Sequence, residues 1–137
     1  MTEHVKVEIA AGVMTLTLQR PEKKNALTGG MYDAMSNALK QAEADPSVRV
    51  ILFQGDGDSF TAGNDLADFA SQARGESAVD SPAHRFIDTI SKAGKPIVAA
   101  VQGNAVGVGT TMLLHCDLVY LAETARLITP FVNLALV

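Results

Sequence analysis

Residues 95–109 read Lys-Pro-Ile-Val-Ala-Ala-Val-Gln-Gly-Asn-Ala-Val-Gly-Val-Gly. The apolar run at 97–101 predicts a buried strand, covered on both faces. The glycines that follow predict a turn over 102–109, and residues 110–116 predict a helix after it. In α/β sheets ligands bind outside the carboxyl ends of the strands, so this turn is a candidate site.

A second stretch repeats the same design. Residues 48–53 predict another buried strand, and the loop after it contains Phe60-Thr61-Ala62-Gly63-Asn64-Asp65-Leu66. Two glycine-shaped turns side by side would aim two backbone N–H groups at one point. Such a pair stabilises a carbonyl oxygen that becomes negative during a reaction, and losing one donor typically costs about 3–4 kcal/mol of barrier.

The remaining pattern predicts an α/β fold with mostly parallel pairing, because strands alternate with helices after an opening hairpin. The hairpin spans residues 5–18 and turns at Ala11-Gly12, and a helix follows Thr28 as its N-cap and stops before Asp45-Pro46. The other expected elements are helices over 66–73 and 83–90 and strands over 117–122 and 125–128.

Length and composition exclude several classes of protein. The chain has 137 residues, of which 47% are hydrophobic and 19% charged, so it forms one ordered domain with a core. A net charge of −4 without a basic stripe argues against nucleic-acid binding, and no apolar run reaches membrane-spanning length. The single cysteine, Cys116, excludes an intrachain disulfide and a multi-cysteine zinc site. We expect no metal and a cytoplasmic location.

Four motifs occur in a fixed order: Arg20-Pro21-x-x-x-Asn25-Ala26-Leu27, then residues 59–66, then residues 95–107, then Cys116-Asp117. In this order they resemble the crotonase superfamily, the enoyl-CoA hydratase/isomerase family, over essentially the whole chain. The resemblance implies a ClpP/crotonase-like spiral of ββα units. Residues 1–137 would form the incomplete, N-terminal core portion of that spiral, with the C-terminal remainder absent.

The resemblance also implies a chemistry. Members bind acyl-CoA thioesters and stabilise an enolate with two backbone N–H groups, which here would be those of Asn64 and Val108. Coenzyme A would be part of the substrate, with no separate cofactor, and the family assembles as trimers or dimers of trimers, so a homo-oligomer is expected. Further substrate-binding residues implied by the match are Ala62, Gly63, Asp65, Leu66 and Gly107, with Lys24 near a phosphate of coenzyme A.

Two departures from the family pattern favour isomerase-like over hydratase chemistry. The positions that carry the two hydratase glutamates are Thr111 and Pro130-Phe131 here. Isomerase-like members use a single base, which the resemblance places just beyond Val137. The apolar residues 134–137 indicate a chain that stops within its core. The alternative is a truncated or non-catalytic homologue that binds CoA thioesters. A Clp-like serine peptidase would need a serine at 107–111, where the only hydroxyl residues are threonines.

Overall fold

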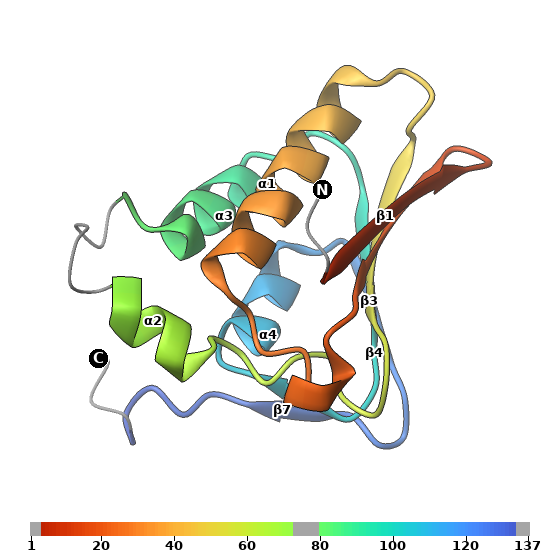
Figure 1. Cartoon of the computed structure of the whole chain (residues 1–137). Helices are drawn as coiled ribbons and strands as arrows, with labels where there is room; N and C mark the ends of the chain where they lie inside the picture. The colour runs from red at the N-terminus through yellow and green to blue at the C-terminus, as the bar shows by residue number, and fades with distance from the viewer. Residues whose placement is uncertain (1–3, 73–79, 134–137) are drawn as a thin grey trace.

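The computed structural model describes residues 4–72 and 80–133 (Figure 1). The expected apolar end at 134–137 lies outside the described residues. The elements, in chain order, are β1 (Val5–Ala10), β2 (Val13–Leu18), the 3-10 helix η1 (Pro21–Lys23), α1 (Gly29–Ala44), β3 (Val50–Gly55), α2 (Leu66–Gln72), α3 (Pro82–Ser91), β4 (Ile97–Val101), β5 (Asn104–Val106), α4 (Val108–Thr111), the 3-10 helix η3 (Met112–His115), β6 (Leu118–Leu121) and β7 (Arg126–Ile128).

The main sheet has five strands in the order β1-β2-β3-β4-β6. The β1–β2 hairpin is antiparallel, whereas β2–β3, β3–β4 and β4–β6 are parallel. The α/β class with a parallel centre is therefore confirmed. A second, two-stranded parallel sheet pairs β5 with β7.

Local sequence accounts for the hairpin and the first helix. Ala11 and Gly12 both have positive φ, which reverses the chain between β1 and β2. The Thr28 hydroxyl accepts a hydrogen bond from the N–H of Met31 at 3.2 Å and so caps α1. Helices α1 and α3 lie together on one side of the sheet (Figure 1), and Phe86 of α3 packs edge-on against Phe53 of β3. This packing forms the main core.

Three sequence expectations differ from the structure. The segment 102–109 contains the strand β5, because Asn104–Val106 pair with the distant Arg126–Ile128. The helix expected at 110–116 instead begins at Val108 and tightens to a 3-10 helix at Met112. Strands β3 and β4 also alternate between buried and half-buried residues, since only one face of the sheet is fully covered by α1 and α3.

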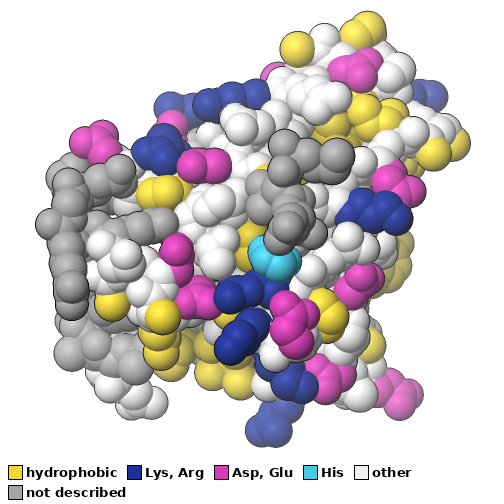
Figure 2. Space-filling model, in the orientation of Figure 1, with side chains coloured by type: hydrophobic (Ala, Val, Ile, Leu, Met, Phe, Trp, Pro, Cys, Tyr) yellow, Lys and Arg dark blue, Asp and Glu magenta, His cyan; other side chains and the backbone are white. Residues whose placement is uncertain are grey.

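Acidic and basic side chains are interspersed on the face shown in Figure 2. Exposed ion pairs on the surface include Lys6–Glu8 and Lys92–Asp88, and pairs of this kind contribute little to stability. In residues 4–72 and 80–133 no helix is both long enough and apolar enough to cross a membrane.

Candidate functional site

The two glycine-shaped turns lie side by side, joined by a short parallel bridge between Thr61 and Ala105. The N–H of Val106 donates to the carbonyl oxygen of Thr61 at 3.0 Å, and the N–H of Thr61 donates to that of Asn104 at 3.1 Å. Gly63 has a φ of +85°, and a β-carbon there would lie 2.7 Å from the carbonyl oxygen of Val106. Only glycine allows this approach without displacing the backbone.

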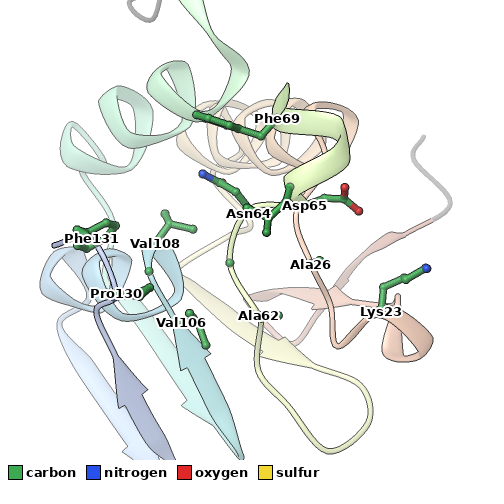
Figure 3. Close-up of a pocket in the computed structure, with 13 residues that line it drawn as sticks. Lys23, Ala26, Ala62, Asn64, Asp65, Phe69, Val106, Val108, Pro130 and Phe131 are labelled. Atoms are coloured by element: carbon green, nitrogen blue, oxygen red, sulfur yellow. The ribbon is translucent and has the colours of Figure 1, made fainter. Parts of the chain in front are cut away.

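A cavity of about 600 Å³ opens where the turns meet (Figure 3). Its lining is mostly apolar, as is usual for small-molecule sites. The residues that line it are Lys23, Ala26, Ala62, Gly63, Asn64, Asp65, Leu66, Phe69, Val106, Gly107, Val108, Pro130 and Phe131.

Both predicted donor residues, Asn64 and Val108, line this cavity. Across the described part of the chain, no hydrogen-bond acceptor is found for the backbone N–H of either residue. Their neighbours are bonded: the N–H of Asp65 donates to Leu27 at 2.9 Å, and the N–H of Gly107 donates to Ile128 at 2.8 Å. Two unpaired main-chain donors therefore belong to residues on the wall of one cavity.

Asn25 holds the first turn in place. It is fully buried with a φ of +57°, and its side-chain amide donates to the carbonyl oxygens of Asp56, Ser59 and Phe60. Its own carbonyl oxygen accepts from the Thr61 hydroxyl at 2.6 Å. The left-handed conformation is one that asparagine tolerates better than most residues, which explains its presence here.

Asp65 is committed to structural contacts. Arg20 lies 2.7 Å from one carboxylate oxygen, and the other accepts from the N–H of Asp68 in the first turn of α2. The Asp68 N–H and the Arg20 guanidinium lower the pKa of the Asp65 carboxyl below its usual value. Although Asp65 lines the cavity, it is an ionised helix cap and is poorly suited to accept a proton.

The lysine expected near a phosphate of coenzyme A does not line this cavity. Lys24 is exposed and its Nζ donates to both carboxylate oxygens of Asp58, at 2.9 and 2.7 Å. Lys23, one residue earlier, lines the cavity instead. Lys24 turns away because the 3-10 helix η1 ends there in a left-handed conformation, a detail that the charged sequence did not indicate.

Most of the remaining predicted positions lie on the cavity wall. Ala62, Gly63 and Gly107 lie on the cavity wall, and Leu66 lies at its edge with 71% of its surface exposed. Phe131 also lines the cavity and approaches Gly107, whereas Thr111 does not line it.

Sequence reasoning missed Phe69 and Tyr32. Phe69 reaches the cavity one turn into α2, and its spacing from Leu66 was the available signal. Tyr32 donates a hydrogen bond from its hydroxyl to the Asn64 side chain, a contact between positions 32 residues apart that no local pattern indicates. Among the residues described, no cluster of histidine, cysteine, aspartate and glutamate could hold a metal ion.

Residues 8–137 match the enoyl-CoA hydratase/isomerase family. The chain belongs to this family. It is 40% identical to enoyl-CoA delta isomerase 2 of Rattus norvegicus over 134 residues, which is 95% of this chain and 34% of that protein. The match to this family confirms the resemblance drawn from the four motifs, and the fold is that of the crotonases.

Solved structures agree with this assignment. OdaA of Pseudomonas aeruginosa is 52% identical with a TM-score of 0.90, covering 97% of this chain and 53% of that one. An enoyl-CoA hydratase/isomerase of Pseudoalteromonas atlantica is 43% identical with a TM-score of 0.90, covering 96% and 51%. The chain thus spans about half the length of these structural relatives.

Proposed function

We propose that the cavity binds an acyl-CoA thioester and that the backbone N–H groups of Asn64 and Val108 hold its carbonyl oxygen. The observation that carries the proposal is a pair of main-chain donors on one cavity wall for which the described residues provide no acceptor. Coenzyme A enters as part of the substrate, so no separate cofactor is needed. Family membership independently favours this substrate class.

The chemistry follows from the thioester. Sulfur delocalises poorly into the carbonyl, so the protons on the adjacent carbon are comparatively acidic. Removing one transfers its bonding electron pair into the carbonyl and leaves a negative oxygen, which two fixed N–H donors stabilise in a site with little water. The apolar walls from Phe69, Val106 and Phe131 would exclude that water.

Isomerisation of the enoyl double bond fits the cavity better than hydration. Hydration needs carboxylates that handle both the water and the proton. Asp65 is the only carboxylate among the described lining residues, and the N–H of Asp68 together with Arg20 favours its ionised form. Phe131 stands where the family resemblance would put a hydratase glutamate. An isomerase needs only a single proton-transferring base. It therefore requires fewer catalytic groups beyond those that the described residues provide.

A second candidate function is thioester binding without turnover. It is favoured by the lack of an uncommitted carboxylate or histidine on the described cavity wall. In this case the two N–H donors would serve recognition alone.

One pair of measurements tests these candidates. Calorimetric titration with acetyl-CoA reports binding, and ultraviolet absorbance of the conjugated thioester reports conversion of a 3-enoyl-CoA into a 2-enoyl-CoA. Binding with conversion supports the isomerase, and binding without conversion supports the non-catalytic reading. Failure to bind any thioester near millimolar concentration overturns both.

We also propose that the protein self-associates. Leu118, Tyr120 and Leu121 of β6 and Leu127 of β7 are each about half exposed or more. Burying such apolar surface is worth about 25 cal/mol per Å². Light scattering tests this part: a monomer at all accessible concentrations would contradict it.

A further inference from the structure

Tyr32 stands under the cavity wall and is held rigidly. Its residue surface is only 3% exposed, and its ring packs against Phe86 with centroids 5.6 Å apart. Burial raises the pKa of its hydroxyl, so the group is a neutral O–H donor throughout the physiological range. That O–H donates to the side-chain oxygen of Asn64.

The contact fixes which way round the Asn64 amide lies. If the amide were reversed, its nitrogen would donate to the tyrosine oxygen. The buried O–H of Tyr32 would then lose the acceptor that the described structure gives it, and an unsatisfied buried donor is costly. The oxygen of Asn64 therefore faces Tyr32, and its NH₂ group, on the opposite edge of the planar amide, faces away from Tyr32.

That NH₂ group lies toward an apolar space. In Figure 3 the Asn64 side chain extends between Phe69 and Val108 with its nitrogen at the tip, whereas the Asp65 carboxylate points the opposite way. In the described ranges 4–72 and 80–133, the NH₂ group of Asn64 has no hydrogen-bond acceptor. Two N–H donors with no protein partner thus adjoin the proposed thioester position.

We propose that the Asn64 amide, oriented by Tyr32, selects acyl-CoA thioesters that carry a hydrogen-bond acceptor oxygen close to the thioester group. This inference rests on the proposed function. The oxygen would belong to a hydroxyl or keto group on the second or third acyl carbon, because the amide and the backbone N–H of one residue are only a few bonds apart. Tyr32 is a positioning residue and does not touch the substrate.

Calorimetric titrations with butyryl-CoA, 3-hydroxybutyryl-CoA and free coenzyme A test the inference. The unaltered protein should bind the hydroxy thioester more tightly than butyryl-CoA. Asn64→Leu keeps the side-chain shape and the backbone N–H, and should weaken the hydroxy thioester about threefold to tenfold, the usual worth of one hydrogen bond. The affinity for butyryl-CoA should fall by a smaller factor than that for the hydroxy thioester, and the affinity for free coenzyme A should change less than about twofold.

Tyr32→Phe tests the positioning role, since it removes only the hydroxyl. It should produce the same selective loss, to a smaller extent, because the amide remains but can rotate. Tyr120→Phe is the matched control: it removes the hydroxyl of the exposed tyrosine on β6, outside the cavity, and should leave all three affinities unchanged.

The outcomes distinguish failure of the proposed function from failure of the selectivity inference. If no thioester binds, the proposed function fails. If thioesters bind but the preference for the hydroxy form is absent, persists in Asn64→Leu, or is lost together with free coenzyme A affinity, the selectivity inference is overturned and the proposed function stands.

A measurement on the unaltered protein tests the inference even if the variants fail to fold. The side-chain NH₂ resonances of Asn64 in nitrogen-15 spectra should shift with 3-hydroxybutyryl-CoA and much less with butyryl-CoA. Equal shifts with both ligands would count against the inference.

Discussion

Gly63 and Val106 come from different turns, yet a β-carbon on Gly63 would lie 2.7 Å from the Val106 carbonyl oxygen. This contact sets how closely the two candidate donor turns approach. The neighbouring Thr61–Ala105 bridge fixes their relative register. The geometry of the cavity wall thus depends on a position where no side chain can fit.

Gly63→Ala is expected to lower the free energy of unfolding by about 2 kcal/mol or more, because it adds both a left-handed alanine and an overpacked contact. Thioester affinity should fall with it. Chemical denaturation and calorimetry measure the two effects. Gly30→Ala is the control, since that glycine lies in the first turn of α1, where a β-carbon would make only an ordinary contact with the Thr28 hydroxyl oxygen at 3.9 Å. Equal stability of the two variants would contradict the argument.

Asn25→Ala should destabilise the protein by about 2–4 kcal/mol, because it leaves several buried backbone groups without partners. Those groups include the carbonyl oxygens of Ser59 and Phe60 and the N–H of Arg20. Urea unfolding gives the free energy. The exposed Asn37 on α1 offers the comparison, and Asn37→Ala should change stability by less than about 0.5 kcal/mol.

Lys95→Met should cost about 2 kcal/mol, because the charged Nζ of Lys95 caps the end of α1. It donates to the carbonyl oxygens of Ala42, Asp45 and Val48 at 2.6, 2.7 and 2.8 Å. Lys92→Met removes only an exposed pair with Asp88 and should cost less than about 0.5 kcal/mol. Thermal unfolding of both variants checks the difference, and similar losses would refute the capping role.

Stability should fall in acid partly through Asp65. Its folded pKa lies below the unfolded value, so its ionised form stabilises the fold above the unfolded pKa. That contribution is lost as the pH falls through the folded pKa. Unfolding free energies measured from neutral pH into acid should therefore decline less steeply in Asp65→Asn than in the unaltered protein. An unchanged slope would show that the Arg20 pair and the α2 cap do not stabilise the carboxylate.

Much of the fold was predictable because its signals are local. The turn at Ala11-Gly12, the Thr28 cap and the apolar runs of β3 and β4 lie within short windows of sequence. The donor turns were predictable too, since glycine punctuation after a strand is a local feature. By contrast, β5 needs the pairing partner β7, about twenty residues further along the chain, and its own three residues carry no strand signal.

The candidate site likewise has features that the sequence predicted and features that it did not. Asn64, Val108 and the glycines beside them were predicted to lie together, and they line one cavity, while their role as donors stays a prediction. The direction of Lys24 was not predictable, because a left-handed residue at the end of η1 turns its side chain to Asp58.

The amino-acid sequence by itself determined the α/β class, the order of the main helices and strands other than β5, and the two turns, because periodicity, capping and glycine act over a few residues. Only the tertiary structure decided which groups at those turns remain available to a ligand. Arg20 forms an ion pair with Asp65, 45 positions away in the chain, and Tyr32 orients Asn64 from 32 positions away. Such contacts exist only once the chain has packed.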